Sequence, residues 1–226
     1  PRTKQSRSSA ASDVYKRQDR NGVEVFRHRI IAPQGNYNNT IEAIAYLVNK
    51  ADNEVNALTK LGIGIPGSLS PRTNLVRNAN STWLIGKPLK QDLEKILKRD
   101  VLIENDANCF AISEAFDGAG SRAHTVFGVI LGTGVGAGIV IGKKIHKGKN
   151  KIAGEWGHNP LPWANEGELP GKKCYCGRTG CLETFISGPA IEREFNNLHG
   201  KNLNMKNIVK ESGAGNFKAE QTIRNF

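Results

Sequence analysis

The sequence predicts an α/β protein in which short strands and longer helices alternate through the first half of the chain. Apolar segments that end at glycine or proline, such as 61–67, alternate with segments whose apolar residues recur at helical spacing, such as 89–97. Farther along, the glycine-rich segment 132–138 lies between two apolar runs, as expected for a hairpin. Alternation followed by a hairpin indicates an α/β fold with both parallel and antiparallel strands.

The elements of the first hundred residues follow from their patterns. Val23, Val25 and residues 26–31 alternate with polar neighbours and predict a strand. Thr40 is the expected N-cap of a helix. The apolar face of that helix comprises Ile41, Ile44, Ala45, Leu47 and Val48. Residues 61–67 predict a short strand ended by a Pro-Gly turn, and 89–97 predict a helix with one apolar face.

The next elements surround two polar residues. Residues 101–103 predict a buried strand, which runs into Asn105 and Asp106 at the start of another helix. Asn105 is the expected N-cap of that helix. Residues 125–131 and 139–141 predict strands on either side of the glycine-rich segment.

The chain divides into three predicted parts. Residues 1–18 are polar and rich in Ser, Arg and Lys, without helical or strand periodicity, and predict a disordered tail or sequence foreign to the fold. Residues 19–117 predict an N-terminal α/β lobe, and 118–226 predict a C-terminal lobe that carries the cysteines 174, 176 and 181. The boundary is placed at the small, flexible residues 117–120.

Composition excludes several classes of protein. With 226 residues, 38% of them hydrophobic, the chain suits one large domain or two small lobes with a packed core. It contains no run of 18 apolar residues, so we expect no membrane partner. The absence of an apolar stretch at the N-terminus indicates no secretory signal and predicts a cytoplasmic protein.

The net charge of +11 raises the question of nucleic acid. The densest basic patch comprises Lys143, Lys144, Lys147, Lys149 and Lys151. No aromatic residues interleave with these lysines, so a platform for stacked bases is not indicated and we expect no nucleic-acid partner. The patch is interpreted as a solvated loop, with attraction of an anionic nucleotide as the alternative.

Three of the four cysteines lie close together in the segment KKCYCGRTGCLE. Cys174, Cys176 and Cys181 are expected to remain reduced, since disulfides are rare in the cytoplasm. Three thiolates suit a tetrahedral zinc ion, and His158 is the nearest upstream imidazole that could complete it. The alternative is three ordinary thiols. Cys109 is interpreted as a small apolar helix residue.

A zinc ion with four protein ligands would be structural, because no position remains for an activated water. Its expected role is to fix the loops that carry Glu155 and Glu183.

Two further features suggest phosphate chemistry. The segment 131–138, LGTGVGAG, would let backbone N–H groups approach phosphate oxygens, although a tight hairpin with packed glycines explains it equally well. It is neither a Walker A loop nor a dinucleotide fingerprint. Asp106 opens a helix whose positive end favours an ionised carboxylate, so it is a candidate base; the alternative is a capping acid.

Four segments together resemble the ROK family of sugar kinases and repressors: ENDANC (104–109), LGTGVGAG (131–138), GEWGHNPLPW (154–163) and CYCGRTGCLETFISG (174–188). The segments GIPGSLSP (64–71) and NANSTW (78–83) resemble its bacterial fructokinase and mannokinase branch. The resemblance implies a two-lobed, actin-like (ribonuclease-H-like) sugar kinase fold that is incomplete at both termini. For this reason we expect the chain of 226 residues to be inactive by itself.

The resemblance also implies roles for individual residues. Asp106 would be the catalytic base on the attacking sugar hydroxyl. The residues implied to bind the sugar are Asn105, Glu155, His158 and Glu183, with Gly67, Ser68 and Asn80 lining the same pocket. Those implied to contact the ATP phosphates are Gly132, Thr133 and Gly134. Those implied to bind zinc are His158, Cys174, Cys176 and Cys181, with the second ring nitrogen of His158 on or near the sugar.

The activity implied is ATP-dependent phosphorylation of a hexose, fructose or mannose, at the 6-hydroxyl, with Mg²⁺, structural Zn²⁺ and a homodimer. The alternatives are a glucose or N-acetylhexosamine kinase of the same family, or a catalytically dead sugar-binding or regulatory fragment. A transcriptional repressor would need a helix-turn-helix before the kinase-like part, and residues 1–18 cannot form one.

Overall fold

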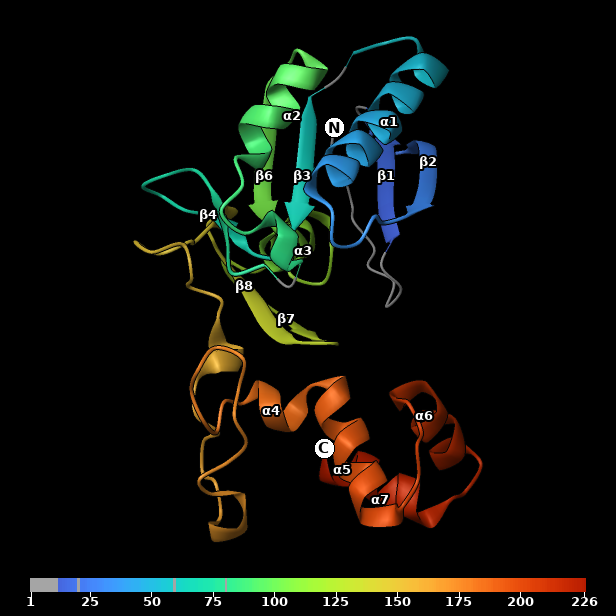
Figure 1. Cartoon of the computed structure of the whole chain (residues 1–226), viewed down its shortest axis with the longest axis vertical. Helices are drawn as coiled ribbons and strands as arrows, with labels where there is room; N and C mark the ends of the chain where they lie inside the picture. The colour runs from blue at the N-terminus through green and yellow to red at the C-terminus, as the bar shows by residue number, and fades with distance from the viewer. Residues whose placement is uncertain (1–11, 20, 59, 80) are drawn as a thin grey trace. The chain divides into compact units, whose positions relative to one another are not determined.

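The computed structural model describes residues 12–19, 21–58, 60–79 and 81–226 (Figure 1). The chain forms two compact units: the first runs up to Gly128 and includes Gly138–Ile152, and the second comprises Val129–Ala137 and Ala153–Phe226. The division therefore falls within two strands and one loop, rather than at residues 117–120. Among the described residues, no helix combines the length and the apolar character needed to cross a bilayer.

The first unit begins with an antiparallel pair, β1 (Ser12–Gln18) and β2 (Glu24–Ile31). The rings of Tyr15 and Phe26 meet across the pair, with centroids 6.2 Å apart. Arg17 is buried and donates to the Ala57 carbonyl oxygen at 2.9 Å. The prediction of a tail without structure is therefore wrong for Ser12–Gln18, because contacts with a neighbouring strand can override weak local periodicity. Residues 1–11 lie outside the described part of the chain.

Helix α1 (Tyr37–Val55) begins earlier than its pattern predicted. Its N-cap is Asn36, whose side-chain oxygen accepts from the Asn39 N–H at 3.0 Å. The predicted cap, Thr40, lies inside the first turn, where it donates to the Asn36 carbonyl and accepts from the Trp83 indole. Asparagine caps a helix at least as well as threonine, so the earlier residue takes the position.

Strands β3 (Leu61–Ile65) and β6 (Val101–Asn105) form a parallel pair in which Ile65 lies opposite Asn105 (Figure 1). Helix α2 (Leu89–Leu97) and α1 share one apolar core with this pair. The buried members include Ile41, Val48, Leu61, Ile65, Leu89, Leu93 and Val101. Burial of these side chains fixes both strand ends at the same edge of the pair.

Three short elements, β4 (Ser68–Leu69), β5 (Val76–Arg77) and the 3₁₀ turn η1 (Thr82–Leu84), connect β3 to α2. Parallel and antiparallel pairs are both present, as predicted, but the described strands belong to four small sheets rather than one. The largest has the order β7-β8-β9, formed by Thr125–Leu131, Val135–Ile141 and Lys144–Ile145.

Helix α3 (Asp106–Asp117) packs so closely that two strand positions must be glycine. A Cβ on Gly138 would lie 2.6 Å from both the Ala107 carbonyl oxygen and the Ala111 methyl group, and one on Gly128 would lie 2.8 Å from that methyl group. Gly138 therefore belongs to β8 and not to a loop, and the strand is longer than the predicted 139–141. Several glycines of LGTGVGAG are thus strand residues, and only 132–134 form the connection.

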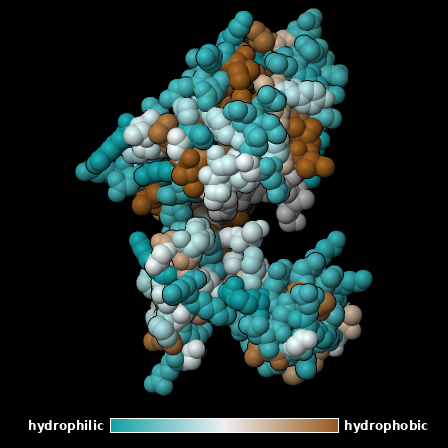
Figure 2. All heavy atoms as spheres, in the orientation of Figure 1, coloured by the Kyte–Doolittle hydropathy of each residue, from teal (hydrophilic) through white to brown (hydrophobic). Residues whose placement is uncertain are grey.

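The second unit combines loops with short helices. Its 3₁₀ turns are η2 (Trp156–His158) and η3 (Glu166–Glu168). Its α-helices are α4 (Glu183–Ile186), α5 (Gly188–His199), α6 (Met205–Gly213) and α7 (Phe217–Asn225). The last three helices bury Phe195, Ile208 and Ala219 against one another. The visible face of these helices is largely hydrophilic in Figure 2.

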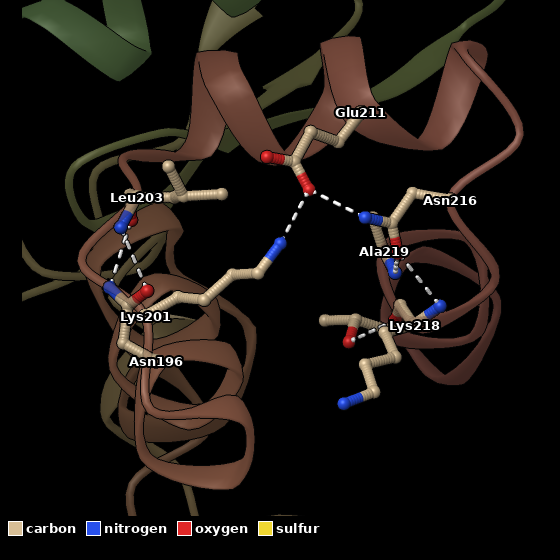
Figure 3. Close-up of polar contacts among 8 residues, drawn as sticks. Asn196, Lys201, Leu203, Glu211, Asn216, Lys218 and Ala219 are labelled. Carbon is tan, nitrogen blue, oxygen red and sulfur yellow. Dashed lines mark hydrogen bonds and ion pairs between the residues drawn. The ribbon is translucent and has the colours of Figure 1, made fainter.

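Polar side chains close the connections between α5, α6 and α7 (Figure 3). The Asn196 side chain accepts from the Leu203 N–H at 2.8 Å and donates to the Leu203 carbonyl at 2.9 Å. Glu211 accepts from the Lys201 ammonium at 3.0 Å and from the Asn216 amide at 2.7 Å. Asn216 also caps α7. The Asn216 cap satisfies backbone N–H groups that α7 leaves without partners at its start, and the Asn196 side chain pairs the Leu203 backbone between α5 and α6.

We expect Gly138→Ala to lower the free energy of unfolding by about 1–3 kcal/mol, because the added methyl group must displace the α3 backbone. Gly213→Ala is the matched control. It meets no atom within 4 Å at the end of α6 and should raise stability by about 0.4–1 kcal/mol, through the entropy of the unfolded chain. Urea denaturation followed by circular dichroism measures both. Equal stability of Gly138→Ala and the unchanged protein would contradict the packing.

Candidate active site and metal centre

Four of the predicted sugar-site residues lie at the carboxyl ends of β3 and β6. The Asn105 amide donates to the Gly67 carbonyl oxygen at 3.1 Å and so joins the two strand ends. Gly67 has φ +112°, and a Cβ there would lie 2.6 Å from the Arg77 carbonyl oxygen, so only glycine fits. Ser68 follows at the start of β4. The carboxyl ends of parallel strands are a common location of ligand sites in α/β proteins.

Asp106 is the first residue of α3 and is half-buried. Asn105 is the N-cap, as predicted, and its side-chain oxygen accepts from the Asn108 N–H at 3.1 Å. Asp106 itself accepts from the Ala107 N–H at 2.8 Å. The positive end of the helix favours its ionised form. Asn105 therefore fills the N-cap position, which weakens the alternative role of Asp106 as a capping acid. The remaining predicted residue here, Asn80, lies outside the described residues.

Glu104 is a partner of this group that the sequence reasoning did not single out. Its Oε1 accepts from the Asn105 N–H at 3.0 Å and from the Asn108 amide at 3.1 Å. Its Oε2 lies 2.5 Å from the Lys147 ammonium. Burial raises the pKa of the neighbouring Cys109 thiol to about 11, and the charge of Glu104 adds to that increase. The signal for Glu104 was its place in ENDANC.

Two lysines of the basic patch have partners within the protein. Lys147 pairs with Glu104, and Lys143 donates to the carbonyl oxygens of Ala115 and Ser121. The prediction of a solvated loop is therefore wrong for Lys143, which is half-buried, whereas Lys147 stays exposed although it pairs with Glu104. Spacing along the chain did not reveal these pairs, because their partners come from α3, β6 and the segment that follows α3.

The second unit brings together the four predicted metal ligands. The ligand atoms of His158, Cys174, Cys176 and Cys181 all lie within 4.8 Å of one another. The Sγ atoms of Cys176 and Cys181 are 3.6 Å apart, and Cys174 Sγ lies 3.5 Å from His158 Nδ1. A tetrahedral zinc with bonds of about 2.3 Å to sulfur and about 2.0 Å to nitrogen separates its ligand atoms by about 3.5–3.8 Å. The residues therefore fit a zinc ion.

Backbone hydrogen bonds build this geometry. Cys174 N–H donates to the Arg178 carbonyl at 2.8 Å and closes the cysteine loop. Leu182 N–H donates to the Asn159 carbonyl at 2.8 Å, which places the His158 segment beside Cys181. Burial raises the pKa of the Cys181 thiol to about 12, and hydrogen bonds with the neighbouring thiols add to the increase. A metal ion would therefore displace protons as it binds.

His158 presents Nδ1 to the thiols, while its Nε2 lies 3.1 Å from the Tyr175 hydroxyl. The resemblance had implied a sugar beside that second nitrogen, and Tyr175 is the residue that meets it. The sequence analysis did not single out Tyr175. Burial, followed by the charges of Glu183 and Glu155, raises the pKa of Tyr175 to about 12. The His158 N–H donates to the Glu155 carbonyl oxygen at 3.3 Å, and Glu183 begins α4 two residues after Cys181. Both residues with predicted carboxylates therefore adjoin the segments of the cluster.

The predicted phosphate loop, Gly132, Thr133 and Gly134, also belongs to the second unit. Gly132 N–H donates to the Gly134 carbonyl at 2.9 Å and closes a tight turn. Glu183 accepts from the Val135 N–H at 2.7 Å. The second unit thus gathers the metal ligands, the phosphate loop, Glu155 and Glu183, while the first unit gathers Gly67, Ser68, Asn105 and Asp106.

A cavity of about 240 Å³ opens in the first unit between α1 and β3. Its wall is largely apolar and includes Ile44, Leu61 and Ile63, with Glu104 and Cys109 at one side. None of the described residues assigned to sugar, phosphate or metal lines it. The chemistry described above therefore lies outside this cavity.

Comparison with known proteins identifies the family. The profile of the ROK family matches residues 18–226. An N-acetyl-D-glucosamine kinase of Pectobacterium carotovorum subsp. carotovorum (strain PC1) is 38% identical over 207 residues, which cover 90% of this chain and 68% of that protein.

Two solved structures share the fold. A ROK family glucokinase from Streptomyces griseus, in complex with glucose and AMPPNP, superposes with a TM-score of 0.74 at 27% identity, over 92% of this chain and 69% of that one. The ROK hexokinase from Thermus thermophilus gives a TM-score of 0.72 at 27% identity, over 89% of this chain and 65% of that one. The chain thus spans about two thirds of the length of its relatives.

The fold is therefore the α/β, actin-like fold of ROK sugar kinases, present in part. The profile match, the relative at 38% identity and the metal-ligand cluster agree on one assignment. The chain belongs to the ROK family, as a relative of its sugar kinases.

Proposed function

We propose that the protein is an ATP-dependent hexose kinase and that its sugar is N-acetyl-D-glucosamine. The observation that carries the choice of sugar is the 38% identity, over 207 residues, to a relative named for that activity. Fructose and mannose were favoured by two short segments, GIPGSLSP and NANSTW, whereas this likeness extends along most of the chain. The N-acetylhexosamine alternative is therefore the better supported.

Asp106 is the proposed base in this reaction. It would take the proton of the attacking sugar hydroxyl as the phosphoryl group transfers. Its place at the start of α3 keeps the carboxylate ionised, and the bond between Asn105 and Gly67 holds the adjoining backbone. Phosphoryl transfer depends mainly on positioning and electrostatics, which one oriented carboxylate and fixed amides supply.

The backbone N–H groups of Thr133 and Gly134 are the proposed contacts to the ATP phosphates. Gly132 N–H is already donated to the Gly134 carbonyl, and Val135 N–H to Glu183. Glu183 uses Oε2 for Val135, so Oε1 is the oxygen we assign to a sugar hydroxyl. Glu155, from the same unit, is the second proposed carboxylate for the sugar. The resemblance alone proposes Ser68 and Asn105, from the first unit, as further sugar contacts.

A structural zinc ion is part of this proposal, because the four ligand atoms lie within 4.8 Å of one another and two of their separations match a tetrahedral site. Bound to His158, Cys174, Cys176 and Cys181, it would hold the loops in place without activating water. Mg²⁺ would arrive with ATP and neutralise its phosphate charge. A cytoplasmic location agrees with the reduced thiols, and the homodimer stays a prediction from the resemblance.

The sugar is tested with the intact protein that contains these 226 residues, in a coupled assay of ATP consumption with N-acetylglucosamine, N-acetylmannosamine, glucose, mannose and fructose. The substitutions below are made in the same protein. We expect kcat/KM for N-acetylglucosamine to exceed that for each other sugar by about tenfold or more, because unmatched polar groups in a sugar site are costly. A higher value for fructose or mannose would contradict the choice of sugar. Sugar binding without phosphorylation of any sugar would favour the catalytically dead alternative.

Asp106→Asn should lower kcat by about 10²-fold or more, because the amide keeps the shape of the side chain but cannot accept the proton. Sugar affinity, measured by calorimetry, should stay within about tenfold. Asp117→Asn, at the exposed opposite end of α3, is the matched control and should leave kcat unchanged. Normal turnover in Asp106→Asn would reject its role as base.

Cys176→Ser should lose most of its zinc and unfold at a lower temperature, because a hydroxyl replaces one of four ligands. Metal analysis of the purified protein should find one zinc per chain before the change. Cys109→Ser is the matched control, since Cys109 lies on α3 in the other unit and should leave the zinc content unchanged. Full zinc content in Cys176→Ser would exclude ligation.

A further inference from the structure

The loop 132–134 is held by the segments that carry the metal ligands. Glu183 begins α4, directly after the loop that ends at Cys181 and Leu182. Its Oε2 accepts from the Val135 N–H at 2.7 Å, the first amide of β8 after the loop. An ionised acceptor makes this bond stronger than one between neutral groups. The position of the loop thus depends on the position of the cysteine segment.

The space around Gly134 shows how close the Glu183 carboxylate lies to the loop. A Cβ on Gly134 would be 2.8 Å from Glu183 Oε2, and the only other atom within 4 Å of it would be the Glu183 carboxyl carbon. Glycine therefore leaves room here for the Glu183 carboxylate, a role unrelated to phosphate. An alanine at this position would push the carboxylate from the Val135 N–H without meeting backbone.

The segment that contains His158 also contacts Val135. Gly157, which precedes His158, packs on Val135, and a Cβ there would lie 2.2 Å from the Val135 carbonyl oxygen. Gly188 N–H, at the start of α5, donates to the Gly132 carbonyl at 2.8 Å. The loop is thus held at Gly132 and at Val135, on both sides of the residues proposed to meet phosphate.

We propose that Glu183 is a positioning residue for the glycine loop and that the metal centre acts through it on nucleotide binding. The cysteine segment places Glu183, and Glu183 fixes Val135 and with it Thr133 and Gly134. Metal occupancy would then control nucleotide affinity as well as the sugar loops. The nucleotide part of this inference rests on the proposed kinase function, whereas the link between metal and loop does not.

The link is tested by hydrogen–deuterium exchange of the segment 131–137 in the zinc-loaded chain, followed by mass spectrometry. Glu183→Ala should increase the exchange rate in this segment about tenfold or more, because the Val135 N–H loses its acceptor. Glu183→Gln keeps an oxygen acceptor and should restore most of the protection. Glu194→Ala, on the exposed side of α5, is the matched control and should behave as the unchanged chain.

Two further measurements keep the inference testable if Glu183→Ala folds poorly. Gly134→Ala should also increase exchange in 131–137, while exchange in β3 stays constant and shows that the other unit is intact. Removal of zinc with a chelator should have the same local effect. Unchanged exchange in 131–137 after both Glu183→Ala and zinc removal would overturn the inference.

Nucleotide affinity separates this inference from the proposed function. Calorimetry with AMPPNP should give a Kd about tenfold higher for Glu183→Ala than for Glu183→Gln, with equal zinc content. Faster loop exchange in a protein that binds no nucleotide would refute the kinase proposal and leave the positioning role supported. Normal AMPPNP affinity and normal loop exchange in Glu183→Ala would refute the positioning role and leave the kinase proposal supported.

Discussion

The second unit depends on the convergence of four ligand atoms within 4.8 Å of one another. The segment from Ala153 to Cys181 has little regular structure, apart from two 3₁₀ turns and two isolated bridges. A loop of this kind cannot bury enough apolar surface to hold a single conformation. A metal ion that joins His158 to the cysteines would supply the missing constraint, since its binding free energy contributes directly to folding.

In the first unit, apolar packing rather than a metal ion holds the predicted site residues in one conformation. Apolar side chains of α1 and α2 enclose the parallel pair β3–β6, and this fixes Gly67, Asn105 and Asp106 at one edge. Glu104 and Lys147 extend the arrangement by joining the start of α3 to the basic segment. The Asp106 carboxylate, which is the proposed base, needs this support, because small displacements of a reacting group strongly reduce the reaction rate.

Glycine has two different roles in LGTGVGAG. Gly132 and Gly134 form the turn, and Gly134 leaves space for the Glu183 carboxylate. Gly138 lets α3 approach β8 closely. The sequence analysis had offered a phosphate loop and a hairpin with packed glycines as alternatives. The description of packed glycines holds for Gly138, whereas phosphate contact at 132–134 stays a proposal. The packing role could not be assigned before the contacts of each glycine were known.

Periodicity and turn residues alone determined most elements, including β3, α2, α3 with its Asn105 cap, and β7, because these depend on local pattern and capping. The cysteine spacing and the upstream His158 likewise predicted the four residues that the structure brings together. Only the tertiary structure decided the pairing of β1, the start of α1, the partners of Lys143 and Lys147, and the contact of Glu183 with Val135. Each of these depends on groups distant in the sequence, whose approach is set by packing and not by the residues' own preferences.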